Sequence, residues 1–88
     1  MANIVASIKL FPEDIVADKE GFKEAVKKSL PSGSSLYKIE EEPIAFGLVA
    51  FIAHVVMADA GGELERVEEA LRCVKGVSEV ETLMVRRV

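Results

Sequence analysis

Apolar and polar residues alternate near the start of the chain, as they do in a strand with one buried face. This period of two covers residues 4–11, and Pro12 closes the segment. Apolar residues then recur at spacings of three and four, which predicts an amphipathic helix whose N-cap is Asp18. The apolar stripe of this helix consists of Phe22, Ala25, Val26 and Leu30. The segment 31–35, which contains proline, glycine and three serines, ends the helix.

In the second half of the chain, the spacing of apolar residues changes again from that of a helix to that of a strand. Residues 36–42 predict a weaker strand with Tyr37 and Ile39 on one face. Three consecutive acids and Pro43 at its end suit the edge of a sheet, where they discourage pairing with other chains. The remaining elements are a strong strand, a second helix and a last strand, over residues 48–57, 63–75 and 77–88.

This order of strand, helix, strand, strand, helix and strand is typical of the ferredoxin-like sandwich. We therefore expect an α+β fold in which two helices cover one face of a four-stranded antiparallel sheet. A length of 88 residues supports one modest core. The sequence thus predicts a single domain over residues 1–88.

The strand at residues 48–57 is apolar on both faces, although a sheet covered on one side should alternate apolar and polar residues. The set with the bulkiest side chains, from Val49 to Met57, is expected to face the helices. The other set is expected to line the open face and consists of Leu48, Ala50, Ile52, His54 and Val56. So much apolar surface on the second face of a small domain predicts a protein partner that covers it.

Charge and composition narrow the classes of partner. The chain has 15 acidic and 11 basic residues and a net charge of −4, which disfavours binding to nucleic-acid phosphates. A single cysteine, Cys73, excludes an internal disulfide, and the first residues lack the basic and apolar segments of a signal peptide. The longest apolar run is too short to cross a bilayer as a helix. The sequence therefore predicts a cytoplasmic protein that contacts neither nucleic acid nor membrane.

Isolated residues that could carry chemistry have simpler structural interpretations. His54 is the only histidine and has no further metal ligand at suitable spacing, so a half-buried strand residue is favoured. Cys73 is expected to act as a small apolar residue beside the stripe of the second helix. The glycine pair at 61–62 precedes a helix, but the acids that follow would repel a phosphate. The acids at 40–42 alternate between faces and do not converge on one ion. We expect no metal site, no cofactor and no bound nucleotide.

Phe46 and the two C-terminal arginines each have two possible roles. Phe46 stands in a tight turn between Ala45 and Gly47, where its ring either folds back onto the core or anchors a partner. Arg86 and Arg87 lie near the end of the last strand, where alternation places them on opposite faces. They either keep the chain end soluble or enter an anionic site on a partner.

The turn and the two ends of the chain resemble those of a known family. The segments EEEPIAFGL and VVMAD, the opening IVASIKLFP and the final MVRR are similar to elongation factor 1-beta of the archaeal type, over essentially the whole chain. The turn PIAFGL is the most specific part of this similarity. The resemblance implies a guanine-nucleotide exchange factor for elongation factor 1-alpha, the GTPase that delivers aminoacyl-tRNA to the ribosome. It also implies that the protein binds no nucleotide itself and performs no covalent chemistry.

The same resemblance implies roles for individual residues. The turn aromatic of the family contacts the GTPase and matches Phe46, which is flanked by Gly47. The family's basic residue next to the last position reaches the magnesium and phosphate site of the GTPase. Its match is Arg87, where eukaryotic relatives have lysine, and Arg86 takes this role if the strand register shifts. The family often carries a lysine after the turn, whereas this chain is apolar at Val49–Ala50, so no charge contact is expected there.

Other functions of the same fold remain as alternatives. The main one is a ligand-sensing regulatory domain that dimerises through its sheet and binds a metabolite at the interface. An RNA-binding module would need aromatic residues paired on the central strands in basic surroundings, which Phe11 and Phe51 lack. A metal chaperone would need a Cys-x-x-Cys motif after the first strand, where this chain has residues PED, and it is excluded.

Overall fold

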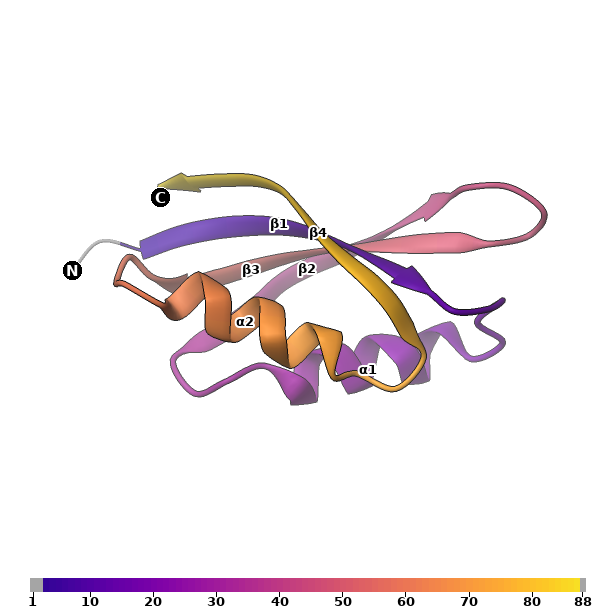
Figure 1. Ribbon diagram of the computed structural model, residues 1–88, viewed down its shortest axis with the longest axis horizontal. Coiled ribbons are helices and arrows are strands. Elements are labelled where there is room, and N and C mark those ends of the chain that lie inside the picture. Colours follow the sequence, from indigo (N-terminus) through magenta and orange to yellow (C-terminus); the bar gives the residue numbers. More distant parts are fainter. Residues whose placement is uncertain (1–2, 88) are drawn as a thin grey trace.

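The computed structural model describes residues 3–87 as a four-stranded antiparallel sheet with both helices on one face (Figure 1). The elements follow the predicted order: β1 (Asn3–Pro12), α1 (Lys19–Ser29), β2 (Ser34–Pro43), β3 (Val49–Ala58), α2 (Glu63–Arg72) and β4 (Val77–Arg87). The strand order across the sheet is β2-β3-β1-β4. The prediction of a ferredoxin-like sandwich is confirmed, and the acidic strand β2 forms an edge as expected.

The core lies between the sheet and the helices and is built on the two central strands. Of the predicted inward set of β3, the residues from Phe51 to Met57 are almost completely buried, whereas Val49 is only partly buried. The rings of Phe22 from α1 and Phe51 pack with their centroids 4.6 Å apart, and α2 adds Val67 and Leu71. Burial of these large apolar side chains is the main favourable contribution to folding.

The two helices differ from the predicted ones in detail. Asp18 caps α1 as predicted, because its carboxylate accepts a hydrogen bond from the backbone N–H of Gly21 at 3.0 Å. Ala25, however, is exposed, so the buried stripe of α1 is narrower than the spacing indicated. The expectation for Cys73 was wrong: α2 ends at Arg72, and Cys73 is exposed in the following turn.

The edge strand β2 contains a β-bulge that the sequence did not reveal. Leu36 pairs with Val55 and Lys38 pairs with His54, which leaves Tyr37 without a partner in the ladder. The extra residue shifts the alternation of side chains by one position. Ile39 therefore packs against the core, whereas Tyr37 is 68% exposed. The prediction that these two side chains share one face was wrong.

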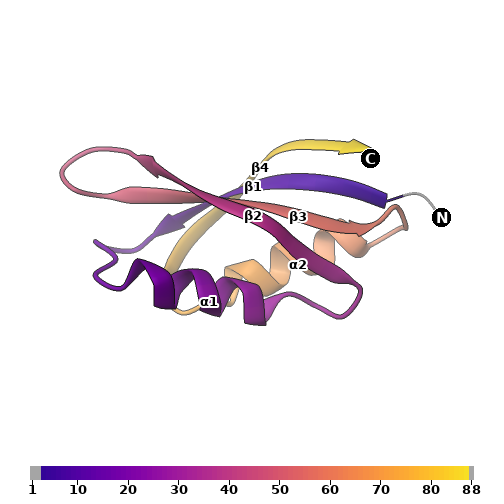
Figure 2. The same ribbon diagram turned by 180° about the vertical axis from the view of Figure 1, so that it is seen from behind.

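The molecule is elongated, with extents of 42 × 20 × 18 Å. The hairpin that joins β2 to β3 projects beyond the helices at one end, while β4 finishes at the other end beside the start of β1 (Figures 1 and 2). Strand β3 runs the length of the sheet between these two ends. Any residues near the two ends therefore occupy separate surfaces.

Candidate partner-binding site

The hairpin turn presents Phe46 to solvent. The turn is closed by two backbone hydrogen bonds, from Ile44 N to Leu48 O and from Leu48 N to Ala45 O, each 2.9 Å long. Phe46 has a φ of 53° and Gly47 a φ of 80°, so both adopt the left-handed conformation. This conformation is uncommon for a bulky residue and is held here by the hydrogen-bonded turn. The Phe46 ring is 96% exposed, which excludes the interpretation that it folds back onto the core.

Two other exposed apolar side chains lie at this end of the molecule. Ile44 belongs to the same turn and Ile15 to the loop after β1, and both are exposed. A side chain added at Gly47 would meet Ile15 Cδ1 at 3.5 Å, so the loop lies directly beside the turn. We call the exposed group of Ile15, Ile44, Phe46 and Gly47 the hairpin tip. An exposed apolar group on a small domain is typical of a protein contact.

The C-terminal arginines lie at the opposite end of the sheet. Arg86 pairs with Val5 and Arg87 with Ile4, so their side chains point to opposite faces as predicted. Arg87 lies on the helix side, where its Nε atom is 3.3 Å from Oδ2 of Asp59. Its side chain is nevertheless 80% exposed. The structure thus presents an exposed guanidinium at a strand end, beside one carboxylate.

The structure does not bring Phe46 and Arg87 together. The hairpin tip follows the pairing of Pro43 with Val49, whereas Arg87 lies beside the far end of β3. The two groups therefore act as one site only on a partner large enough to contact both ends of the molecule.

His54 has two polar partners that sequence reasoning missed. Its Nδ1 atom lies 2.8 Å from the Ser7 hydroxyl oxygen, and its Nε2 atom lies 2.7 Å from Oε1 of Glu40. His54 pairs directly with Ser7 across the ladder, and Glu40 lies two residues beyond its other ladder partner, Lys38. The strand register would have predicted these contacts, but the spacing in the sequence could not. The prediction that His54 is a half-buried strand residue is confirmed, since its side chain is 17% exposed.

The charge state of Glu40 fixes the direction of these hydrogen bonds. The hydrogen bond from His54 lowers the pKa of Glu40, and the nearby Lys38 ammonium lowers it further. An ionised carboxylate only accepts hydrogen bonds, so His54 carries a proton on Nε2. In the neutral ring, Nδ1 then accepts from the Ser7 hydroxyl. The hydrogen-bonded chain Ser7–His54–Glu40 links side chains from three strands, and each of these side chains has a hydrogen-bond partner.

The other acids of β2 each have their own cation. Glu41 lies on the helix side, 2.9 Å from Lys23 and 3.6 Å from Lys19. Glu42 lies on the open face, 3.2 Å from Lys9. The prediction that the acids alternate between faces is confirmed. Among residues 3–87, no group of three or more histidines, cysteines or acids is arranged to hold a metal ion.

The ion pair of Glu41 and Lys23 makes the stability of the fold depend on pH. The hydrogen bond with Lys23 lowers the pKa of Glu41 from its ordinary value of 4.5, and the same bond raises the pKa of Lys23. A lowered carboxyl pKa stabilises the fold above the ordinary value, and this contribution disappears as the pH falls through the folded-state value. Glu41→Gln is therefore expected to lower the melting midpoint at about pH 7, and to lower it less at about pH 3, below the ordinary value of 4.5.

Thermal melting followed by circular dichroism across this pH range checks the expectation. Glu24→Gln is a suitable control, because Glu24 is exposed on α1 and has no ion pair among the described residues. An equal loss at both pH values would contradict the role given to the Glu41 charge.

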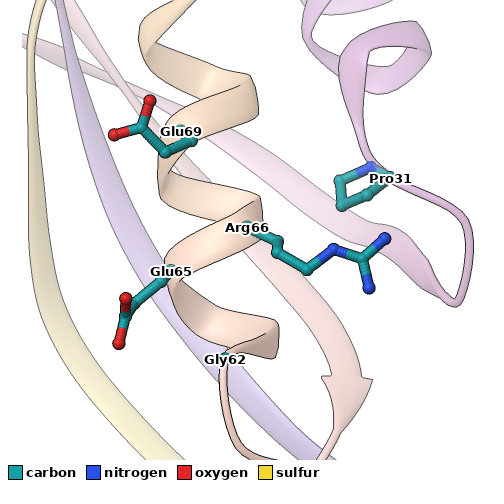
Figure 3. A pocket seen from close by; sticks show the side chains of 5 residues that line it. All are labelled: Pro31, Gly62, Glu65, Arg66 and Glu69. Atoms are coloured by element: carbon teal, nitrogen blue, oxygen red, sulfur yellow. The ribbon is translucent and has the colours of Figure 1, made fainter.

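Another surface depression lies away from all of these residues. It has a volume of ≈ 550 Å³ and is formed by the start of α2 and the loop after α1 (Figure 3). Arg66 extends towards Pro31, while Glu65 and Glu69 point to the other side of α2. Arg66 forms a salt bridge with Glu63, with a distance of 3.0 Å. The depression therefore has no set of converging polar groups that could bind a ligand.

No helix in the part of the chain that the structure describes has the length and apolar character needed to cross a membrane.

Comparison with known proteins identifies the family. The EF-1 guanine nucleotide exchange domain matches residues 5–88. The elongation factor 1-beta proteins of Methanothermobacter thermautotrophicus and Methanobrevibacter smithii are 47% and 40% identical to this chain over 88 residues, which cover 100% of it and 99% of each relative.

A solved structure shows the same fold. The ACT domain from the GTP pyrophosphokinase of Chlorobium tepidum matches with a TM-score of 0.62, over 92% of this chain and 99% of that domain. The identity is only 21%, so this likeness shows the fold alone. The match to the exchange domain, in contrast, includes both the hairpin tip and the C-terminal arginines. The chain therefore belongs to the EF-1 guanine nucleotide exchange domain family.

Proposed function

We propose that this protein promotes release of GDP from elongation factor 1-alpha by contacting the GTPase with both ends of its sheet. Guanine nucleotide exchange is the activity of its family, and the match over residues 5–88 is the observation that carries the proposal. In this proposal the chain acts as one exchange domain in the cytoplasm. It performs no covalent chemistry and binds neither nucleotide, nucleic acid nor membrane itself.

Arg87 is the group proposed to act on the nucleotide site. A GTPase holds GDP through backbone amides, a lysine and Mg²⁺, which together neutralise the phosphates. A guanidinium that approaches this site competes with the metal for the same anionic oxygens. Arg87 suits this role because its exposed side chain projects from a strand end and is not buried in the protein's own core.

The hairpin tip is proposed to supply the binding energy. Exposed aromatic residues often contribute most to protein interfaces. The Phe46 ring is fully available, because the turn holds it away from the core. Strand β3 leaves the hairpin at Val49 and ends beside Asp59, which contacts Arg87. Binding at the tip therefore fixes where Arg87 lies on the partner.

The coupling between partner and nucleotide is reciprocal. An exchange factor that binds the GTPase more tightly in the absence of nucleotide must weaken nucleotide binding by the same factor. This protein needs no reacting group of its own to accelerate release. It needs only contacts that are better with the nucleotide-free GTPase.

The test is release of fluorescent GDP from elongation factor 1-alpha of the same organism, followed after addition of excess unlabelled GDP. We expect the release rate to rise with the concentration of this protein and to reach a plateau. An unchanged release rate at every concentration would refute the proposal. Sedimentation of the isolated protein tests the alternative of a regulatory domain, which requires a stable dimer.

A further inference from the structure

The open face of the sheet carries a depression that the proposed roles of Arg87 and Phe46 do not use. It has a volume of ≈ 270 Å³, and Tyr37 of β2 and Arg86 of β4 stand on its opposite sides. An adjoining depression of ≈ 320 Å³ shares Val5, Tyr37 and Arg86 with it. The helices cover the other face of the sheet, so this region is open to a partner (Figure 2).

A row of residues across all four strands forms the floor, and each edge strand has a bulge next to it. The row consists of Lys38, His54, Ser7 and Met84. Tyr37 is unpaired beside Lys38, and the register shift in β4 leaves Leu83 unpaired beside Met84. Bulges re-aim side chains and are frequent beside functional sites. Here the bulge in β2 places the Tyr37 side chain beside this row.

Among the residues that the structure describes, Arg86 is the only charged residue of this depression without an oppositely charged partner. The polar groups of the floor are satisfied within the chain Ser7–His54–Glu40, and Lys38 lies 4.0 Å from the same Glu40 carboxylate. Within residues 3–87, the Arg86 guanidinium has no ion pair and the Tyr37 hydroxyl has no hydrogen-bond partner. Val5 and Val56 provide an apolar wall beside them.

We propose that this depression binds a carboxylate side chain of elongation factor 1-alpha, held by the Arg86 guanidinium. One uncompensated positive charge matches one carboxylate, and the planar guanidinium fits a carboxylate with two parallel hydrogen bonds. A phosphate would leave about one negative charge unbalanced on this half-apolar surface. Tyrosine, methionine and arginine, which surround the depression, are also the residues enriched at protein interfaces.

The position of Arg86 favours the GTPase over a free ligand as the source of the carboxylate. Arg86 is the immediate neighbour of Arg87 and points to the other face of the same strand end. A GTPase that contacts Arg87 therefore lies next to this depression. The inference rests on the proposed function and adds a third contact, which fixes the orientation of the strand end.

The experiment compares exchange by the wild type and by Arg86→Gln over a range of concentrations. We expect the half-saturating concentration to rise about tenfold, with an unchanged plateau rate, because a lost charge-assisted hydrogen bond weakens binding. Arg86→Lys is expected to recover only part of the affinity, since lysine lacks the planar fork. Lys27→Gln removes one exposed positive charge on α1 and is the matched control. Melting midpoints show that each variant is folded.

Each outcome of this experiment decides a separate point. If the wild type does not accelerate release, the proposed function fails. If it does and Arg86→Gln stays within about twofold of the Lys27→Gln control, the carboxylate site is wrong. The carboxylate site would also be wrong if Arg86→Gln lowered the plateau rate of GDP release and left the half-saturating concentration unchanged. Arg86 would then act on the nucleotide site. Millimolar free glutamate that raises the melting midpoint of the wild type but not of Arg86→Gln would instead assign the site to a small ligand.

Discussion

Arg87→Ala is expected to reduce the plateau rate of GDP release on the order of a hundredfold, the effect typical of removing one group that stabilises charge at a reacting centre. The affinity for elongation factor 1-alpha should change much less, because the hairpin tip, which is proposed to supply the binding energy, is intact. Stopped-flow release of fluorescent GDP gives the plateau rate, and calorimetry gives the affinity. The separation of these two quantities is what identifies Arg87 as the group that acts on the nucleotide site.

Two substitutions provide the controls for Arg87. Arg72→Ala removes another exposed arginine, which pairs with Glu69 at 3.1 Å, and should leave exchange unchanged. Arg87→Lys keeps the positive charge and should retain a substantial part of the rate. If the affinity of Arg87→Ala fell in proportion to its rate, Arg87 would be an ordinary binding residue, and the proposed role would be wrong.

Phe46→Ala is expected to weaken the complex with elongation factor 1-alpha about thirtyfold, which corresponds to about 2 kcal/mol for a central interface aromatic. The plateau rate should be recovered at high concentration, since Arg87 still reaches the nucleotide site. The melting midpoint of the isolated protein should be unchanged, because an exposed ring contributes little to folding. Calorimetry against the GTPase and thermal melting of the isolated variant measure these two effects.

The control for Phe46 is a long exposed side chain at another place. Lys28→Ala shortens such a side chain on α1, which lies on the other side of the sheet from the proposed carboxylate site. It should bind as the wild type does. Unchanged affinity of Phe46→Ala would show that the hairpin tip is not a contact, and Arg87 would then have to act without this anchor.

The sequence predicted the architecture well because each element has its own local period. The stripe from Phe22 to Leu30 and the alternation in residues 4–11 depend only on neighbours along the chain. The same patterns contain no information on which residues face each other across strands. Tyr37 was therefore placed on the wrong face, since a bulge is a property of the pairing between β2 and β3.

The sequence also could not predict the contacts between strands at the candidate site. The hydrogen-bond partners of His54 are 47 and 14 residues away in the chain. They can be identified only when the pairing of the strands is known. The exposure of Phe46 depends on a backbone conformation that its sequence context allowed but did not require. For Arg86 and Arg87, alternation predicted the opposite faces correctly. It did not predict Asp59 as the neighbour of Arg87, because this contact joins the ends of two strands that are not adjacent in the chain.

Strand β3 sets the distance between the two ends that are proposed to contact the GTPase. It is ten residues long, and it pairs with β1 without a register shift from Phe51 to Ala58, the residue before Asp59. A strand advances about 3.3 Å per residue, and side chains keep their face only if residues are added or removed in pairs. Without a bulge, a longer or shorter β3 that keeps every side chain on its face changes this span in steps of about 7 Å. In the proposed complex, the length of β3 therefore sets the spacing that the two contact surfaces of the GTPase must match.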